Sequence, residues 1–322
     1  MQDHTPRTNP VDRRKFISTV GAAAVAGGLG SLLPIRALAG LSKSPTSEAV
    51  KELHASLTAV QKKKLCLPFD HKLKSRINPN WHITEPILGE DFYTSAQREL
   101  ATRVVKSLCS EDGYERLLKQ MDEDSGGIED YSMAFFGEPE SGKFQWELTG
   151  RHLTLRADGE KNDRLAFGGP LVYGHGEEES PEANLFFYQT KQVNKVFASL
   201  DETQRKAAMM NKVPRETDVR LQGKKGRFRG IAVKNLSADQ KTLLVESLKV
   251  LLSPFREEDI QEVMWILLEN GGVDSLSMAF SKKGDLADDG MWDVWRIEGP
   301  AFVWHFRGAP HVHAYINIGA KV

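Results

Sequence analysis

The sequence predicts an α+β fold: an internally duplicated module of helices and an antiparallel hairpin, with pseudo-two-fold symmetry. The first observation is a repeated segment, which reads GGIEDYSMAF at 126–135 and GGVDSLSMAF at 271–280. The second is a W-x3-G pattern after each segment, beginning at Trp146 and at Trp295. The third is a pair of glutamines with the same separation in both copies: Gln61 and Gln97, then Gln204 and Gln240. Because all these anchors recur in one order, duplication explains them better than chance.

Residues 1–39 are expected to be a twin-arginine signal peptide. Arg13 and Arg14 precede Phe16, an Ala/Gly-rich apolar run covers 19–33, and small residues at 37–39 offer a cleavage site. The apolar run is too short and too rich in glycine for a stable membrane span. We therefore expect export by the twin-arginine translocase to a periplasmic or secreted location, with residues 40–52 as a linker. The alternatives are a general secretory signal and an uncleaved anchor.

The composition limits the function classes. Basic and acidic residues number 43 and 44, and the formal net charge is −1. This balance gives no positive surface field, so nucleic-acid binding is not expected. The two cysteines, Cys66 and Cys109, lie in segments that read as helical and could either pair or remain free buried thiols. Since no C-x-x-C occurs, a thiol-based metal or redox motif is absent.

Each copy is expected to contain the same elements in the same order. A first helix and a segment with strand tendency come at 55–67 and 76–83 in one copy, and at 201–211 and 227–233 in the other. Apolar residues at helical spacing then predict two helices per copy: 95–110 and 113–122, and 238–252 and 257–269. Gly-Gly pairs end these helices and lead into hairpins: 131–136 with 144–155, and 276–280 with 292–305. Because neither half should bury a core alone, 53–322 is predicted as one domain of two repeats, about 53–175 and 196–318.

The last strand-like stretch, residues 295–318, closes on His311-Val312-His313. In an extended strand, residues two apart point to the same face. The pair therefore offers two imidazole nitrogens side by side to one metal ion. The alternative is that one or both are ordinary half-buried strand histidines.

The histidines differ between the two copies. When Trp146 is aligned with Trp295, Leu171 and Tyr173 fall where the second copy carries its H-x-H pair. This alignment indicates that the backbone does not require imidazoles there, which favours a functional role for them. We therefore expect one site, built from His311 and His313 of the second copy and His152 of the first.

Further candidates could complete this site. His175 and His305 are candidate ligands, although His175 adjoins an acidic loop that could simply be a solvated turn. Glu298 is the carboxylate nearest in sequence and could bind the metal, orient an imidazole, act in catalysis or be a plain hairpin charge. Arg296, with Arg151 and Arg76, could clamp a substrate carboxylate or form ordinary ion pairs. Three imidazoles with water, or two with a carboxylate, are usual arrangements for catalytic zinc, copper or iron.

The chain resembles a family of bacterial, often exported proteins grouped as a domain of unknown function. The motifs that carry the resemblance are Gly150-Arg-His-Leu153, Trp295-x-Ile-Glu-Gly-Pro300 and His311-x-His313. The resemblance spans about residues 53–318 and implies that His152, His311 and His313 belong to one site. It implies no reaction and no substrate. The stretch 168–175 departs from the family pattern, so His175 is the least secure of the residues carried over.

The sequence therefore predicts an exported, metal-dependent enzyme, hydrolytic or oxidative, that acts on a small molecule. The metal is expected to be a divalent transition ion, zinc, copper or iron, with Glu298 and Arg296 as candidate catalytic residues. Neither G-x-S-x-G, Walker A, H-E-x-x-H nor a Rossmann glycine motif occurs, which disfavours those standard enzyme classes. One alternative is a non-catalytic periplasmic protein that binds a metal or small ligand. Another is an interaction module in which the histidines are structural.

Overall fold

The computed structural model describes residues 45–159, 165–176, 178–212 and 214–319. The chain divides into two units after Pro45, and the second, Thr46–Val322, carries the fold. The predicted signal peptide, 1–39, lies outside the described residues. Within the described ranges, no helix has both the length and the apolar character needed to cross a membrane.

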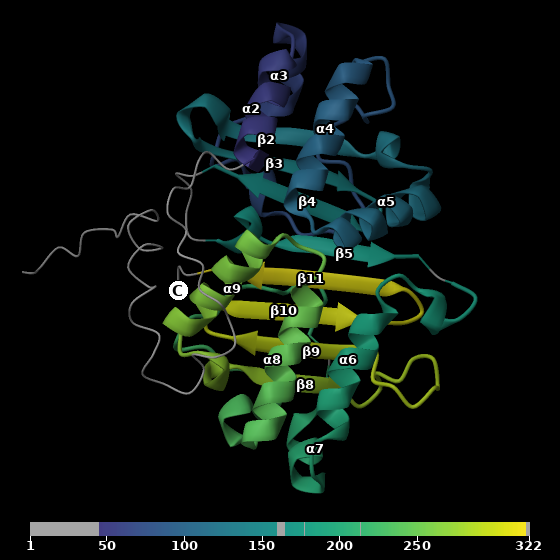
Figure 1. Cartoon of the computed structure of the whole chain (residues 1–322), viewed down its shortest axis with the longest axis vertical. Coiled ribbons are helices and arrows are strands. Elements are labelled where there is room, and N and C mark those ends of the chain that lie inside the picture. Colours follow the sequence, from purple (N-terminus) through teal and green to yellow (C-terminus); the bar gives the residue numbers. More distant parts are fainter. Residues whose placement is uncertain (1–44, 160–164, 177, 213, 320–322) are drawn as a thin grey trace, which may run out of the picture. The chain divides into compact units, whose positions relative to one another are not determined.

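The predicted α+β class is confirmed by one large mixed sheet with helices packed on it (Figure 1). In the described part of the chain the sheet has eleven strands in the order β1-β2-β3-β4-β5-β11-β10-β9-β8-β6, with β7 paired to β8. The strands of the N-terminal half are β1 (Cys66–Leu67), β2 (Ser132–Glu138), β3 (Lys143–Gly150), β4 (Leu153–Asp158) and β5 (Leu171–His175). Those of the C-terminal half are β6 (Met209–Met210), β7 (Ile231–Ala232), β8 (Ser277–Ser281), β9 (Val294–Gly299), β10 (Phe302–Arg307) and β11 (Val312–Ile318).

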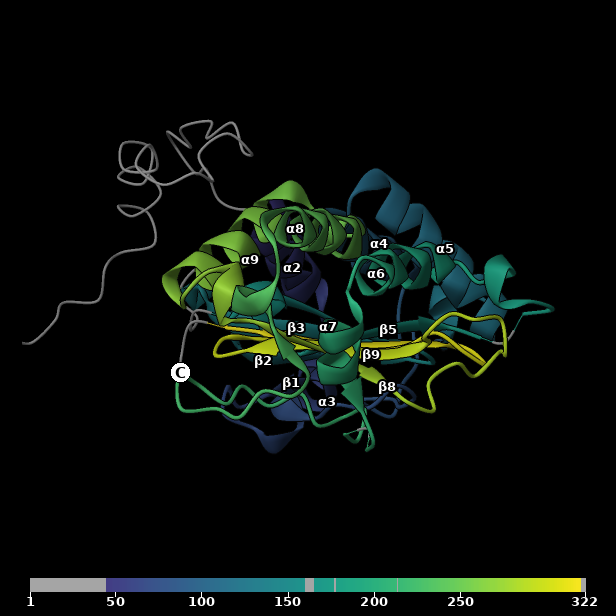
Figure 2. The ribbon, with the colours of Figure 1, turned by 90° about the horizontal axis from the view of Figure 1, so that it is seen from below.

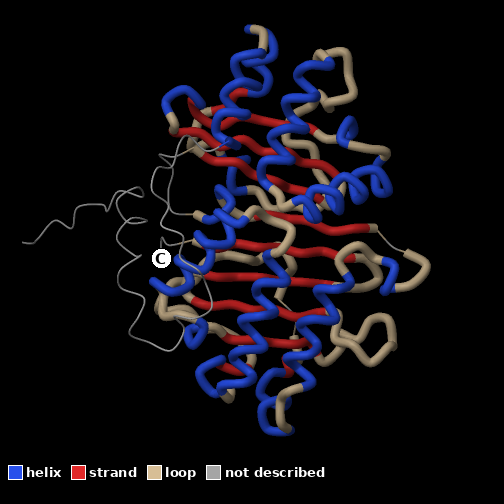
Figure 3. The backbone as a smooth tube through the Cα atoms, in the orientation of Figure 1, coloured by secondary structure: helices blue, strands red, loops and turns tan. Residues whose placement is uncertain are grey.

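The two halves of the sheet meet at β5 and β11, which pair antiparallel in the middle (Figure 3). The outermost pairings, β1 with β2 and β6 with β8, are both parallel. The strand order therefore runs in the same sense from each edge to the centre. This arrangement agrees with two repeats, while the duplication itself stays a prediction.

Helices cover one face of the sheet, as the view along it shows for α4, α5, α6, α8 and α9 (Figure 2). Those of the first half are α2 (Pro45–Ser56), α3 (Ala59–Leu65), α4 (Ser95–Leu108) and α5 (Glu111–Ser125). Those of the second half are α6 (Phe187–Ala198), α7 (Glu202–Ala208), α8 (Ala238–Leu252) and α9 (Glu257–Glu269). The matching glutamines cap helices: Gln61 with Gln97, and Gln204 with Gln240, lie at the starts of four helices and pair through their amides.

The strands alternate between an apolar face and a polar one. In β9, Trp295 and Ile297 belong to the main core under the helices, while Arg296 and Glu298 point to the opposite face. That opposite face is also buried, because extended segments near 76–83 and 214–230 cross it. Buried polar groups need partners, so this face is where charged side chains converge.

Several predicted boundaries are corrected by the structure. Residues 45–52, predicted as linker, form part of α2, because Val50 packs fully buried in the main core. The predicted strand 144–155 is two strands separated by a turn at Arg151 and His152. No element was predicted where α6 forms. Cys66 and Cys109 lie outside helices and are free; burial raises their pKa values to about 11 and about 12.

Cross-strand register also corrects the alignment of the two copies. The β3–β4 and β9–β10 hairpins match, since each closes around a two-residue turn: Gly150 with Leu153, and Gly299 with Phe302. The match stops there, because Leu153 pairs with Tyr173 whereas Phe302 pairs with Ile318. By register Tyr173 corresponds to Ile318, so its predicted correspondence with His313 is wrong. The case for His313 must therefore rest on its contacts.

Candidate metal centre

Backbone geometry brings His152 across the sheet to β11. His152 is the second residue of the β3–β4 turn and adopts a left-handed conformation, with φ 54°. The next strand, β5, presents Gly174 beside it, and Gly174 pairs in turn with His313. A Cβ on Gly174 would lie 3.4 Å from the His152 Cβ and 2.1 Å from the Val312 carbonyl oxygen. The missing side chain thus leaves room for the two imidazoles to approach.

His311 completes a group of three imidazoles. It lies in the loop before β11, and its Nε2 is 3.2 Å from the His313 Nε2. The His152 ring centroid lies 5.1 Å from those of both His311 and His313. One nitrogen from each ring lies within 4.8 Å of the other two. The three residues expected to form one site are therefore side by side.

Two carboxylates fix the outer edges of these rings. Asp124, near the end of α5, places Oδ2 2.8 Å from the His152 Nδ1. Glu216 places Oε2 2.9 Å from the His313 Nδ1 and accepts a hydrogen bond from the Tyr315 hydroxyl at 3.1 Å. Carboxylates that hold Nδ1 leave Nε2 to face a metal, the usual arrangement behind metal-binding histidines.

The electrostatics suit metal binding. Burial, followed by the neighbouring His313, lowers the pKa of His311 to about 4. Burial likewise lowers the pKa of His313, against the opposing effect of Glu216. Burial would raise the pKa of Glu216, but the hydrogen bond with His313 and the charge of Arg307 outweigh it, and the pKa falls to about 2. At neutral pH these two imidazoles are therefore neutral, as metal coordination requires, and Glu216 is charged.

Arg307 adjoins the imidazoles on β10, where it pairs with His313. Its Nε lies 2.7 Å from the Glu216 Oε1, and its Nη2 lies 2.6 Å from the His313 Nδ1. The same Nη2 is 3.3 Å from the His311 Nε2. The His313 Nδ1 cannot accept from Arg307 and donate to Glu216 at once, so two tautomers compete at this ring.

The predicted catalytic pair, Arg296 and Glu298, does not reach the imidazoles. Arg296 Nε donates to Glu298 Oε2 at 2.9 Å, and Arg296 Nη2 donates to the Asp218 carbonyl oxygen at 2.6 Å. Glu298 Oε1 also accepts from the Arg229 backbone N–H at 3.0 Å. Both residues thus hold the segment 214–230 against the sheet, and that segment carries Glu216.

His305 also lies apart from the three imidazoles. It is fully buried on β10, opposite Arg296 on β9 and Tyr315 on β11, and neither ring nitrogen has a described partner. Burial, followed by the charge of Arg296, lowers its pKa to about 4. Among the described residues, neither group that could hold a metal includes His305.

His175 belongs to a second group with Glu123 and Glu178. Its Nε2 lies 2.8 Å from Glu123 Oε2 and 3.3 Å from Glu178 Oε1. Its Nδ1 accepts the Leu185 backbone N–H at 3.4 Å. That bond places the ring proton on Nε2, where it donates to Glu123 and leaves no lone pair for a metal. The contacts therefore favour a hydrogen-bonded histidine over a ligand.

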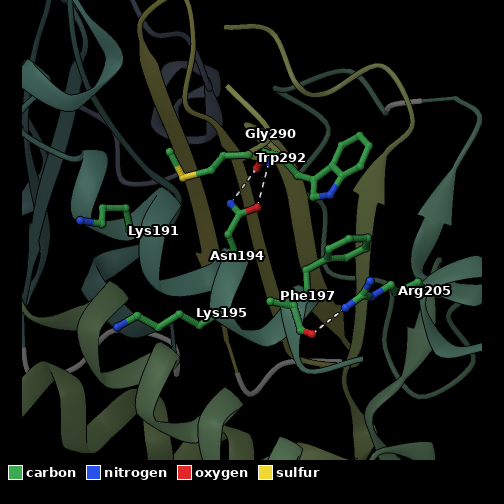
Figure 4. A pocket seen from close by; sticks show the side chains of 9 residues that line it. Lys191, Asn194, Lys195, Phe197, Arg205, Gly290 and Trp292 are labelled. Carbon is green, nitrogen blue, oxygen red and sulfur yellow. Dashed lines mark hydrogen bonds between the residues drawn. The ribbon is translucent and has the colours of Figure 1, made fainter. Parts of the chain in front are cut away.

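A cavity of about 460 Å³ lies against α6 and the segment before β9 (Figure 4). Lys191, Lys195 and Arg205 lie around it, together with Phe197 and Trp292. Several of its polar groups already have partners: Lys195 bonds Gln192, Arg205 bonds the Ala198 carbonyl, and Asn194 bonds the Trp292 backbone. None of the described residues that line it is a histidine, so these residues include none of the proposed metal ligands.

Three residues of the centre were not singled out as candidates from the sequence: Asp124, Glu216 and Arg307. Asp124 carried a usable signal, because a carboxylate at a helix C-terminus opposes the helix dipole. Arg307 lies two residues after His305 on β10, so strand alternation places both on the same face. Glu216 lies in irregular structure and carried no local signal.

The comparisons with known proteins extend the resemblance seen in the motifs without naming a reaction. No curated protein and no solved structure matches the chain. A family model does match, over residues 40–316, and this range includes both histidine groups. The chain therefore belongs to the family described as "Protein of unknown function (DUF3500)".

Proposed function

We propose that His152, His311 and His313 bind one divalent transition-metal ion, and that the protein is a metal-dependent enzyme acting on a small molecule. The observation that carries this proposal is the convergence of three imidazoles, two of them held at Nδ1 by carboxylates. Carboxylates at Nδ1 are the usual outer partners of metal-binding histidines.

The spacing of the nitrogens supports the same conclusion. Two nitrogens bound to a tetrahedral zinc ion at about 2.0–2.1 Å lie roughly 3.3 Å apart. The Nε2 atoms of His311 and His313 are 3.2 Å apart. Little rearrangement of this pair is therefore needed to bind an ion.

Three protein ligands favour catalysis over a purely structural role. A structural zinc site is usually closed by four protein ligands, whereas a catalytic site keeps a position for water or substrate. His311 is only partly buried, so that position can face solvent. An ion held there would lower the pKa of a bound water or polarise a substrate oxygen. Hydrolytic and oxidative reactions are both open to such a centre.

We further propose that the chain is exported through the twin-arginine pathway before it acts. The support is the sequence alone, with Arg13 and Arg14 ahead of an Ala/Gly-rich run. A fusion of residues 1–52 to a reporter should reach the periplasm, and Arg13→Lys with Arg14→Lys should retain it in the cytoplasm. Export that persists in the double variant would contradict the twin-arginine route.

Metal analysis of untagged protein tests the metal site. Wild-type protein, purified and then reconstituted with zinc, copper or iron, should hold about one equivalent of one of these metals. His311→Ala should lose most of it, while circular dichroism stays unchanged. His82→Ala is a matched control, because His82 is exposed and its ring bonds the Asp130 carbonyl oxygen, away from the three imidazoles.

The result also separates the enzyme from its alternatives. Occupancy below about 0.2 equivalents for every metal in wild-type protein would overturn the proposal and leave the histidines structural. Full occupancy with an exchangeable water on the metal supports an enzyme. Full occupancy without an open position indicates a non-catalytic metal-binding protein.

A further inference from the structure

Arg307 contacts two histidine ring nitrogens, and metal binding would break both contacts. Its side chain is 16% exposed, and its Nη2 lies near two ring nitrogens, the His313 Nδ1 and the His311 Nε2. Each of these nitrogens can accept from Arg307 only through a free lone pair. The guanidinium also forms an ion pair with Glu216, with 2.7 Å between its Nε and the Glu216 Oε1.

An ion in the centre would take both acceptors away from Arg307. The lone pair on the His311 Nε2 would be donated to the metal. For His313 to bind through Nε2, its proton must sit on Nδ1 and point to Glu216. The Nη2 of Arg307 would then face two groups that no longer accept, and leaving a mostly buried donor unpaired is costly.

The net charge of the metal-loaded centre also favours an anionic ligand. The imidazoles of the loaded centre are neutral. Its positive charges are those of a divalent ion, Arg307 and Arg151, and its negative charges are the carboxylates of Asp124 and Glu216. The positive charges therefore exceed the negative ones. Arg151 is half exposed, precedes His152 in the turn, and its Nε lies 4.0 Å from the Asp124 Oδ1. An anion bound beside the ion would restore the balance.

We propose that the substrate of this centre carries an oxyanion group, a carboxylate or a phosphate, and that Arg307 is the residue that binds it. This inference rests on the proposed metal site, because the metal is what releases Arg307 from His311 and His313. The guanidinium then presents a planar fork of N–H groups beside the ion, which matches two oxygens of one anion. Metal binding must therefore precede tight anion binding.

Cobalt(II) offers a direct test, because its visible spectrum reports ligands that enter the metal centre. Protein reconstituted with cobalt is titrated with sodium acetate and, separately, with sodium phosphate, at an ionic strength held constant with sodium chloride. Cobalt content is measured on every sample. We expect saturable binding of at least one anion, and the two arms show whether the group preferred is a carboxylate or a phosphate.

The variants separate anion binding from metal binding. Arg307→Lys keeps the charge beside Glu216 but removes the fork, so cobalt content should hold while anion affinity falls about tenfold or more. Arg307→Gln should lower the affinity for the anion further, because it also removes the charge. Arg220→Lys is the control, since Arg220 is 85% exposed and pairs with Asp218.

Each outcome bears on one of the two proposals or on both. Equal anion affinity in wild type and Arg307→Lys, with cobalt bound, overturns the role of Arg307 and leaves the metal site standing. Cobalt-loaded protein that binds neither anion has the same consequence, as does metal-free protein that binds them equally well. Wild-type protein that binds neither cobalt nor zinc, copper or iron overturns both proposals.

Discussion

Two histidine groups are contacted by neighbouring carboxylates of α5, and they differ in which ring nitrogen the carboxylate contacts. Asp124 contacts the Nδ1 of His152, whereas the preceding residue, Glu123, contacts the Nε2 of His175. Both groups bring three candidate ligand atoms within 4.8 Å of one another. Proximity alone therefore does not distinguish them.

The difference lies in the proton on each ring. The Leu185 backbone N–H points at the Nδ1 of His175, which fixes that nitrogen as an acceptor and Nε2 as a donor. At His152 a carboxylate takes the place of the backbone donor and reverses the preference, which frees Nε2. At His313, Glu216 would do the same once Arg307 no longer donates to Nδ1. A carboxylate on Nδ1 prepares a ligand, and a backbone N–H there produces a structural histidine.

Removing one histidine from each group should give the largest difference in metal affinity between the two groups. His152→Ala deletes one of three ligands, so metal affinity should fall by more than about 100-fold, beyond the usual cost of losing only an outer partner. His175→Ala should change that affinity by less than about threefold. Competition with a chromophoric chelator measures both constants. Equal losses in the two variants would mean that both groups bind metal.

His305, outside both groups, should make the stability of the protein depend on pH. His305 belongs to neither, and its pKa is lowered from 6.5 to about 4, chiefly by burial. Between these pH values the unfolded chain binds a proton that the folded protein does not, so stability falls as the pH falls. His305→Gln removes this titrating group. The fall in the free energy of unfolding between pH 7.5 and pH 4.5 should then be smaller by up to about 3 kcal/mol.

Urea unfolding of metal-free wild type and His305→Gln at pH 7.5 and pH 4.5 measures this effect. The comparison uses the change with pH within each protein, so a general destabilisation by the substitution cancels. Parallel pH profiles for the two proteins would show that His305 titrates normally in the folded state.

Neighbouring carboxylates on α5 offer a finer comparison. Asp124→Asn removes the charge behind His152 and should lower metal affinity about 10- to 100-fold, with the protein still folded. Glu123→Gln, one residue away, should leave metal affinity within about twofold because His175 is not a ligand. The chelator assay applies here as well. A larger loss in Glu123→Gln than in Asp124→Asn would reverse the assignment of the two groups.

Periodic and capping signals predicted much of the fold. The helices 238–252 and 257–269 match α8 and α9 at both ends, because apolar spacing and a strong break at Pro254 act locally. The segment of α6 received no prediction, since its buried face includes Gln189 and Thr190 and so lacks a clear apolar stripe. The β3–β4 turn was also missed, because Arg151 and His152 are not typical turn residues.

The site was predictable only in part, for a reason that follows from the topology. His311 and His313 are two residues apart at the start of β11, and His152 stood out by its motif, so the sequence could name all three. The carboxylates come from segments far away along the chain: Asp124 ends a helix, and Glu216 lies in an irregular segment laid across the sheet. Contacts of that kind depend on the packed structure, and no local pattern reports them.

The smallest expected effect concerns the second group alone. Glu178 lies 3.3 Å from the His175 Nε2 and its side chain is 31% exposed, so solvent screens this contact. Glu178→Gln should lower the free energy of unfolding by less than about 1 kcal/mol and leave metal affinity unchanged. Thermal unfolding measures the first quantity, and the chelator assay the second. A measurable loss of metal in this variant would show that His175, Glu123 and Glu178 hold an ion of their own, and the proton assigned to the His175 Nε2 would then be misplaced.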